Sequence, residues 1–258
     1  MIPRKIHYTW FSGEPYPKII EQCIQSWHHY MPDYEYILWD AERIKKIDNL
    51  WLKQCIETKK WAFAADFVRM YAIYTEGGIY LDTDCMVYRS FDPLLDNVSF
   101  IGKEYSIHVE GRRTEMYLTS HCFGAEKGDW FVGRVLSYYI NRPFVMSEDE
   151  SLPMRLKYNT EYLPFIHSEI AKQIGYNPFP SADMEQHLEH NVTVYPSYYF
   201  DATCETPQTF ARHLAMGSWR EQKMTEDSIT WKYKIKWRLE LILRRFVEHF
   251  GYMLTKKM

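Results

Sequence analysis

Two aspartates stand one residue apart at the end of an apolar run: Asp82 and Asp84, in the stretch EGGIYLDTDCMV. Residues i and i+2 of a strand point to the same side, so a strand here would hold both carboxylates together. Neighbouring carboxylates repel, and one takes up a proton unless a cation lies between them. A divalent metal with oxygen ligands resolves this conflict. The pattern therefore predicts a metal site, although a strand-end turn with two solvated carboxylates is the plainer reading of the motif alone.

A second charged pair lies on the helix predicted just upstream. Residues 61–76, WAFAADFVRMYAIYTE, are rich in alanine and large apolar residues, and two glycines follow, as a left-handed C-terminal turn requires. Asp66 and Arg69 are three residues apart and hence neighbours on one helix face. A solvated pair of this kind contributes about 0.2–1 kcal/mol. These surroundings are apolar, so we expect a pair at the rim of the core, with Arg69 available to phosphate and Asp66 to sugar hydroxyls.

The remaining elements predict an α/β fold. Runs of β-branched and aromatic residues predict strands at 5–11, 34–40, 79–84, 99–104, 117–126 and 191–196. Apolar periodicity predicts helices at 17–30, 41–60, 61–76 and 129–140, with loops and one or two further helices between 142 and 190. The strand–helix–strand opening indicates a sheet flanked by helices.

Composition narrows the classes of partner and compartment. A chain of 258 residues makes one large domain, or one domain with an appendage. The net charge of -3 gives no reason to expect nucleic acid as a partner. Five scattered cysteines, no signal-peptide run and no apolar span of about 18 residues predict a reducing, cytoplasmic location. The aromatic content of 17% suits core packing, or else sugar or base stacking, and a non-catalytic carbohydrate-binding protein is one alternative that it leaves open.

The C-terminal residues differ from the rest of the chain. We expect a domain at 1–225 and a basic amphipathic helical tail at 226–258. The apolar stripe of the tail consists of Ile235, Leu239, Ile242, Leu243, Phe246 and Phe250, with basic residues around it. Such a helix lies on an anionic membrane surface, here the inner face, or else docks on the domain with its charges solvated.

Three blocks of this sequence resemble glycosyltransferase family 32. The run AFAADFVRMYAIYTEGGIYLDTD looks like the family's DxD core, with helix, Gly-Gly and DxD in fixed register. IPRKIHYTWFSG at 2–13 resembles its opening, and ARHLAMGSW, which ends at 219, resembles its close. The resemblance implies a GT-A type nucleotide-sugar-binding sheet, a nucleotide-sugar donor and retention of anomeric configuration.

The resemblance also implies donor-binding positions. Trp10 matches the position against the nucleobase; it also ends the first predicted strand, where open α/β sheets bind ligands. Asp66 and Arg69 match the residues that hold the donor sugar. Tyr80 matches a position beside the ribose or base, and Asp82 one that contacts the sugar or ribose and, through water, the metal.

Metal and diphosphate contacts follow in the same way. Asp84 matches the direct metal ligand, and His213 a second ligand, although a single histidine is more often structural. Ser218 and Trp219 match diphosphate contacts. One imidazole beside carboxylates favours Mn²⁺ over Mg²⁺.

This sequence departs from the family pattern at three places. Leu214 stands where the family often has a second histidine, and His121 where it often has asparagine. The family's Thr-Gly-Pro has no counterpart near NTEYLPF. The last two departures fall where acceptor and sugar identity are decided.

We therefore expect a retaining, metal-dependent hexosyltransferase. It would move a hexosyl group from a UDP- or GDP-sugar to a saccharide or lipid-linked acceptor, in bacterial surface polysaccharide or capsule synthesis. The expected catalytic residues are Asp66, Arg69, Asp82 and Asp84. A metal-dependent phosphohydrolase could use the same aspartates, but Cys85, Met86 and Val87 fit the usual phosphatase pattern poorly. Sugar, base and acceptor stay open, because each discriminating contact is worth only about 1–3 kcal/mol.

Overall fold

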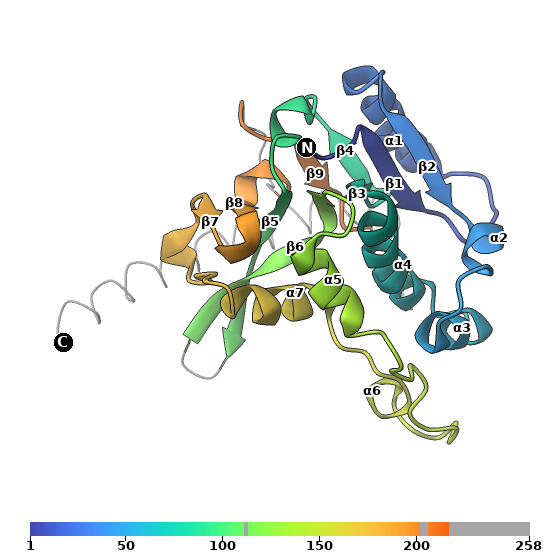
Figure 1. Ribbon diagram of the computed structural model, residues 1–258. Helices are drawn as coiled ribbons and strands as arrows, with labels where there is room; N and C mark the ends of the chain where they lie inside the picture. The colour runs from blue at the N-terminus through green and yellow to red at the C-terminus, as the bar shows by residue number, and fades with distance from the viewer. Residues whose placement is uncertain (111–112, 202–205, 217–258) are drawn as a thin grey trace, which may run out of the picture.

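A seven-stranded mixed sheet forms the centre of the protein (Figure 1). The computed structural model describes residues 1–110, 113–201 and 206–216. The strand order in the sheet is β2-β1-β3-β6-β5-β8-β7. A second sheet of two strands, β4 and β9, lies beside it. The predicted α/β class, with a sheet flanked by helices, is confirmed.

The first half of the sheet is parallel. Strands β1 (Lys5–Thr9), β2 (Glu35–Trp39) and β3 (Gly78–Leu81) run in the same direction, with β1 in the middle. Helix α1 (Lys18–Tyr30) connects β1 to β2, and helix α4 (Trp61–Glu76) leads into β3. The short helices α2 (Ala41–Ile44) and α3 (Leu50–Glu57) lie between β2 and α4. The carboxyl ends of β1 and β3 therefore share one edge of the sheet, where ligands of open α/β sheets bind.

The second half is built on a long hairpin. Strands β5 (Ser99–Glu110) and β6 (Arg113–Ala125) are antiparallel, and β6 is antiparallel to β3. Strand β3 pairs only with 122–125 of β6, so the outer part of the hairpin extends beyond the carboxyl end of β3. Strand β8 (Val192–Tyr195) adds in parallel to β5, and β7 (Gln186–His187) closes the edge. Helix α7 (Leu163–Lys172) lies along the hairpin (Figure 1).

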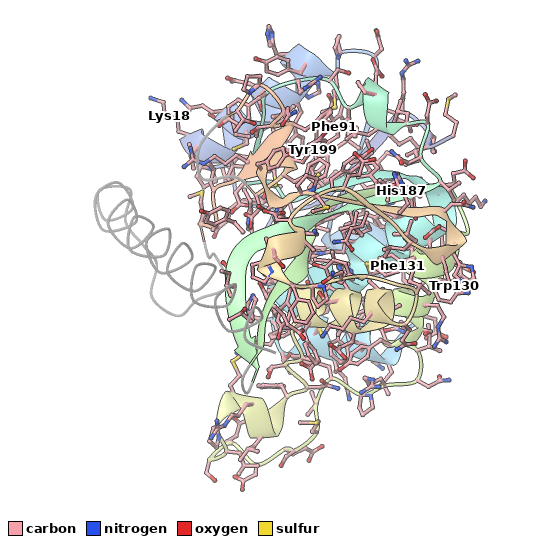
Figure 2. All side chains as sticks on the ribbon, turned by 90° about the vertical axis from the view of Figure 1, so that its left-hand side faces the viewer. Lys18, Phe91, Trp130, Phe131, His187 and Tyr199 are labelled. Carbon is pink, nitrogen blue, oxygen red and sulfur yellow. The ribbon has the colours of Figure 1, made fainter. Side chains whose placement is uncertain are left out.

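Each face of the sheet carries its own core. Helices α3, α4, α7 and α5 (Trp130–Ser137) pack on the face that presents Tyr80 and Phe123. Helix α1 and the strands β4 (Cys85–Val87) and β9 (Ala211–His213) cover the face of Ile79 and Leu81. Figure 2 shows Phe91 and Tyr199 on one side of the sheet and Phe131 on the other. The two-residue repeat of β3 therefore directs Tyr80 and then Asp82 toward α4.

Several elements differ from the sequence prediction. Strands β4, β7 and β9 were not predicted, since three residues or fewer leave no readable period. Both hairpin strands are longer than predicted, because polar residues such as Lys103 and Glu104 interrupt the apolar pattern. The region 142–190 contains α7 and the single turn α6 (Met154–Lys157), as expected. The predicted tail and the boundary at 225 lie outside the described residues.

None of the helices within the described ranges is both long enough and apolar enough to cross a lipid bilayer.

Candidate active site

Arg69 joins the helix α4 to the first aspartate of the DxD motif. Its Nη2 lies 3.2 Å from Oδ1 of Asp66, and its Nη1 lies 3.4 Å from Oδ2 of Asp82. Nη1 also donates to the carbonyl of Ser120 at 2.6 Å, and Nε to that of Ala65 at 3.3 Å. Only 6% of Arg69 is exposed. The guanidinium therefore fixes the distance between helix α4 and the end of β3 and pairs with both carboxylates.

The buried hydroxyl of Tyr80 also contacts Asp82. It donates to Oδ1 of Asp82 at 2.8 Å and lies 3.1 Å from Oγ1 of Thr9 on β1. The Arg69 guanidinium lies 4.8 Å from the centre of the Tyr80 ring. Tyr80 is fully buried, so in this structure it orients Asp82, while the direct nucleotide contact implied by the family stays a prediction.

Asp84 belongs to a different pair. Its Oδ1 lies 3.2 Å from Nε2 of His213, and its Oδ2 accepts from the backbone N–H of Met216 at 3.0 Å. Pairing of β4 with β9 brings His213 opposite Cys85, the residue after Asp84. The two-stranded sheet thus places His213, from the ARHLAMGSW block, beside the DxD motif, although more than 120 residues separate the two in the sequence.

The expectation that both aspartates extend from one strand on the same side is wrong in its geometry. Strand β3 ends at Leu81, and Asp82–Asp84 form a turn closed by the Cys85 N–H and the Asp82 carbonyl at 3.0 Å. The turn directs Asp82 toward Arg69 and Asp84 toward His213. Each carboxylate thereby has its own cationic partner, which relieves the repulsion that the sequence pattern suggested.

The pKa values of the second pair follow from its burial and its charges. Burial is the largest single effect and opposes a charge on His213, but Asp84, Asp82 and Asp201 together outweigh it and raise the pKa of His213 to about 9. Burial also disfavours the Asp84 carboxylate, yet His213 and the Met216 N–H hold the pKa of Asp84 well below its ordinary value. The pair is therefore an imidazolium–carboxylate ion pair at neutral pH.

The environment of Asp66 shifts its pKa in the opposite direction to that of Asp84. Burial raises the pKa of Asp66 to about 6; Arg69 opposes this shift and Asp82 adds to it. A carboxyl group with a pKa near 6 that stays partly exposed can change protonation state near physiological pH.

Two further residues complete the surroundings of His213. The ring of His121 stacks on that of His213, with centroids 4.3 Å apart, and its Nε2 donates to the carbonyl of Phe200 at 3.2 Å. Asp201 accepts from the backbone N–H of Tyr105 at 2.7 Å. Asp201 was not predicted from the sequence, because a single aspartate after an aromatic run carries no readable signal.

The described residues include donor sets that fit a divalent ion. One ligand atom each from Asp82, Asp84 and His213 lie within 4.8 Å of one another, and His121, Asp201 and His213 form a second such group. Carboxylates with one imidazole are the ligands that Mn²⁺ or Mg²⁺ accepts alongside phosphate and water. His213 must release its proton before it can ligate, so metal binding would replace the ion pair with Asp84.

The remaining predicted residues lie in different places. Trp10 follows β1 at the same sheet edge as Asp82; its indole N–H donates to the carbonyl of Glu14 at 2.8 Å, and its ring packs edge-to-face on Tyr16. Its role against a nucleobase stays a prediction. Ser218 and Trp219 lie outside the described residues.

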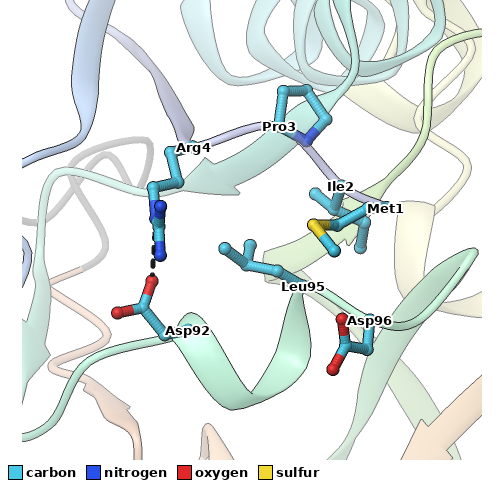
Figure 3. Close-up of a pocket in the computed structure, with 7 residues that line it drawn as sticks. All are labelled: Met1, Ile2, Pro3, Arg4, Asp92, Leu95 and Asp96. Carbon is cyan, nitrogen blue, oxygen red and sulfur yellow. Dashed lines mark hydrogen bonds and ion pairs between the residues drawn. The ribbon is translucent and has the colours of Figure 1, made fainter.

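A pocket of about 320 Å³ lies at the other end of β1 (Figure 3). Met1, Ile2, Pro3, Arg4, Asp92, Leu95 and Asp96 line it. Arg4 immediately precedes β1, whereas Asp82 and Asp84 follow the carboxyl end of the neighbouring strand β3. This pocket is therefore separate from the charged site.

Comparison with known families decides what the DxD geometry belongs to. Residues 17–101 match the family described as glycosyltransferase sugar-binding region containing DXD motif. This segment therefore carries the sequence pattern of that family. The match runs from α1 to the first residues of β5 and so includes Asp66, Arg69, Asp82 and Asp84. The resemblance read from the sequence is confirmed, and it supports a glycosyltransferase.

Curated relatives are fungal proteins. Inositol phosphoceramide mannosyltransferase 3 of Schizosaccharomyces pombe is 29% identical over 65% of this chain and 42% of its own length. Mannosyl phosphorylinositol ceramide synthase SUR1 of Saccharomyces cerevisiae is 33% identical over 42% of this chain and 29% of its own. The chain thus spans less than half the length of these relatives.

One solved structure that aligns with part of this chain is titled PaToxG Glycosyltransferase. It covers 67% of this chain and 69% of its own, with 16% identity and a TM-score of 0.42.

Proposed function

We propose that this protein is a retaining, metal-dependent glycosyltransferase that uses a nucleoside-diphosphate hexose. One observation carries the proposal: the pairing of β4 with β9 brings His213 to 3.2 Å from Asp84, and Asp82 and Asp84 lie in the segment that matches the DXD glycosyltransferase family. Two carboxylates and an imidazole in this arrangement form a site for a cation and a diphosphate.

The residues of the α4 face would hold the donor sugar. Asp66 offers carboxylate oxygens to sugar hydroxyls, and Arg69 keeps both Asp66 and Asp82 in place through its two ion pairs. Tyr80 and Thr9 restrict the rotation of Asp82 from the core side. When bound, Mn²⁺ or Mg²⁺ would stabilise the negative charge that develops on the departing diphosphate. Asp84 and His213 would be its direct ligands, with Asp82 close by.

We expect the transfer to proceed by front-face attack. The bond between the anomeric carbon and the diphosphate oxygen breaks, the acceptor oxygen forms the new bond on the same face, and the departing phosphate takes the hydroxyl proton. Detection of a trapped glycosyl-enzyme adduct by mass spectrometry would contradict this pathway.

The relatives direct the choice of substrates to test. One relative is named as a mannosyltransferase of inositol phosphoceramide. The other is named as a synthase of mannosyl phosphorylinositol ceramide. GDP-mannose is therefore the first donor to try, and a phosphoinositol lipid the first lipid acceptor. The bacterial saccharide acceptor, the cytoplasmic location and the membrane association inferred from the sequence stay predictions.

A transfer assay on the whole chain tests the proposal. Purified protein is incubated with Mn²⁺, a panel of UDP- and GDP-sugars, and saccharide or lipid acceptors. We expect a glycosyl product, or slow sugar release, that EDTA abolishes. Asp84→Asn should remove at least 100-fold of this activity, because removal of one electrostatic stabiliser of a developing charge costs about 10²–10³ in rate. Asp96→Asn, an exposed aspartate at the remote pocket, is the matched control.

Two other outcomes would overturn the proposal. Phosphate release from phosphomonoesters without any glycosyl product would favour a phosphohydrolase. Sugar binding that Asp84→Asn leaves intact, with no turnover of any nucleotide-sugar, would favour a carbohydrate-binding protein.

A further inference from the structure

A cluster of aromatic rings surrounds one buried carboxylate on the part of the hairpin that extends past the site. Glu104 of β5 is 8% exposed. Its Oε1 accepts from the hydroxyl of Tyr162 at 2.8 Å, and its Oε2 lies 3.2 Å from Nε2 of His108. The His108 ring stacks on Tyr117 of β6, with centroids 3.9 Å apart and planes 8° from parallel. We call Glu104, His108, Tyr117 and Tyr162 the hairpin cluster.

An irregularity in the hairpin forms this cluster. Lys103 is opposite Leu118 and Ile107 is opposite Met116, so three residues of β5 face Tyr117 alone. Bulges of this kind bend a strand and redirect its side chains, and they are frequent beside active sites. The N–H of Tyr105 bonds instead to Oδ2 of Asp201 at 2.7 Å. The bulge therefore ties Glu104 to the residue that flanks His213.

The hydrogen bond from Tyr105 to Asp201 connects the hairpin cluster to the surroundings of His213, and electrostatic interactions agree with this placement. Burial and then the charge of Glu104 raise the pKa of Tyr162, with smaller contributions from Asp201 and Asp66. Burial and Glu104 also raise the pKa of Asp201 to about 7. Tyr162 immediately precedes helix α7, which lies along the hairpin (Figure 1). Tyr162 thus lies within electrostatic range of both Asp66 and Asp201.

The chemistry of the cluster suits a ring with several hydroxyl groups. Tyr162 is 46% exposed, so part of its ring is open to a ligand. Aromatic faces pack on the C–H faces of sugars, while a carboxylate accepts hydrogen bonds from their hydroxyls. Each oxygen of Glu104 has one partner among the described residues, and a carboxylate oxygen can accept two bonds.

We propose that the hairpin cluster is the acceptor subsite, and that it binds a cyclic polyol. Tyr162 supplies the stacking surface, and Glu104 accepts a ring hydroxyl while it holds Tyr162 in place. His108 and Tyr117 support Glu104 from the hairpin. A terminal hexose and an inositol head group share this chemistry. The assignment of the cluster to an acceptor rests on the proposed glycosyltransferase function, whereas its binding of a polyol can be tested alone.

Ligand-observed NMR on the full chain tests the binding step. Methyl α-mannoside and myo-inositol are the probes, each with and without Mn²⁺ and GDP. We expect saturation transfer from the wild-type protein to at least one probe, and its loss in Tyr162→Ala and Glu104→Gln. Tyr30→Ala, at a tyrosine of similar exposure at the end of α1, should bind like wild type. Saturation transfer to only one probe shows whether the subsite binds a hexose or an inositol ring. Saturation transfer to neither probe overturns the proposal.

Kinetics separate this proposal from the proposed function. In Tyr162→Phe, which keeps the ring and loses the bond to Glu104, we expect the acceptor KM to rise about 10- to 100-fold, as loss of one hydrogen bond to a charged group predicts. The donor KM should stay unchanged. A wild-type protein without any transfer activity would defeat the glycosyltransferase assignment, while the NMR result would still stand. Transfer activity with unaltered acceptor KM in Tyr162→Phe and Tyr162→Ala would defeat only the acceptor subsite.

Discussion

Arg69 determines the charge balance of the DxD site at the scale of single residues. It is the shared cation of Asp66 and Asp82, and its remaining donors bond to carbonyls of α4 and β6. Asp84 does not share this cation but pairs with His213. The two aspartates of the motif therefore respond to different changes. Loss of Arg69 would leave the carboxylates of Asp66 and Asp82 without a cationic partner, whereas loss of His213 would affect Asp84 alone.

Asp66 gives a pH-dependent prediction. Burial, opposed by Arg69 and reinforced by Asp82, raises its pKa from 3.8 to about 6, so the folded protein binds this proton more tightly than the unfolded chain. The associated stability is complete below pH 3.8 and is lost as the pH rises through 6. Relative to Asp66→Asn, the free energy of unfolding of wild type should fall by about 3 kcal/mol between these limits.

Urea unfolding of both proteins at several pH values between about 4 and 7 measures this difference. Asp66→Asn also removes a partner of Arg69, which changes the free energy of unfolding by the same amount at every pH. The diagnostic quantity is therefore the slope of that free energy against pH, which this constant change does not affect. Curves that run parallel over the whole range would show that Asp66 keeps an ordinary titration in the folded protein.

At the scale of elements, Gly78 allows β3 to lie close enough to β1 to form the site. Its φ of +120° favours glycine, and an added Cβ would lie 2.9 Å from Lys5 Cβ and from the Lys5 carbonyl. Gly175, just after α7, has a φ of +102° but no atom within 4 Å of such a Cβ. The two positions therefore separate the cost of backbone strain from the cost of a steric clash.

Gly78→Ala should destabilise the protein by about 2–4 kcal/mol, the sum of strain and overpacking. Gly175→Ala should cost only about 1 kcal/mol, because strain acts alone there. Thermal or urea unfolding of the two variants gives the comparison. Equal losses at both positions would mean that β1 and β3 can separate without cost, and that the Thr9–Tyr80–Asp82 contacts do not depend on close pairing.

The sequence predicted the elements that have a repeating apolar pattern. Helix α4 and the strand before Asp82 were clear, because their apolar residues are continuous and two glycines separate them. The position of Asp84 was not predictable, since it depends on β9, a three-residue strand with no periodic signal. The hairpin bulge at Glu104 was missed for a related reason: register shifts depend on the partner strand, which the local sequence does not specify.

At the scale of the whole molecule, the site is assembled from three distant parts of the chain. Helix α4 and the end of β3 supply the carboxylates, and β9 supplies His213. The β5–β6 hairpin and the start of α7 supply the hairpin cluster. The family segment at 17–101 contains only the first of these. The two aspartates could therefore be predicted from the motif. The positions of His213 and of the hairpin cluster depend on tertiary structure and could not.

The basic C-terminal residues give a prediction for the whole chain. Deletion of 231–258, which holds eight lysines and arginines around an apolar stripe, should release the protein from anionic vesicles if this segment binds membranes. Vesicle co-sedimentation measures the effect at low and high salt. Binding that the deletion leaves unchanged would contradict a membrane role, and a deletion product that fails to fold would favour docking on the domain.

Anomalous diffraction from crystals soaked with Mn²⁺ and GDP tests the central claim most directly. We predict a manganese peak bounded by Asp84 and His213, with Asp82 nearby and the diphosphate completing the coordination. Crystals of His213→Asn should show a weaker peak or none. Bound GDP with no anomalous peak beside Asp84 in the wild-type protein would contradict the metal-dependent mechanism.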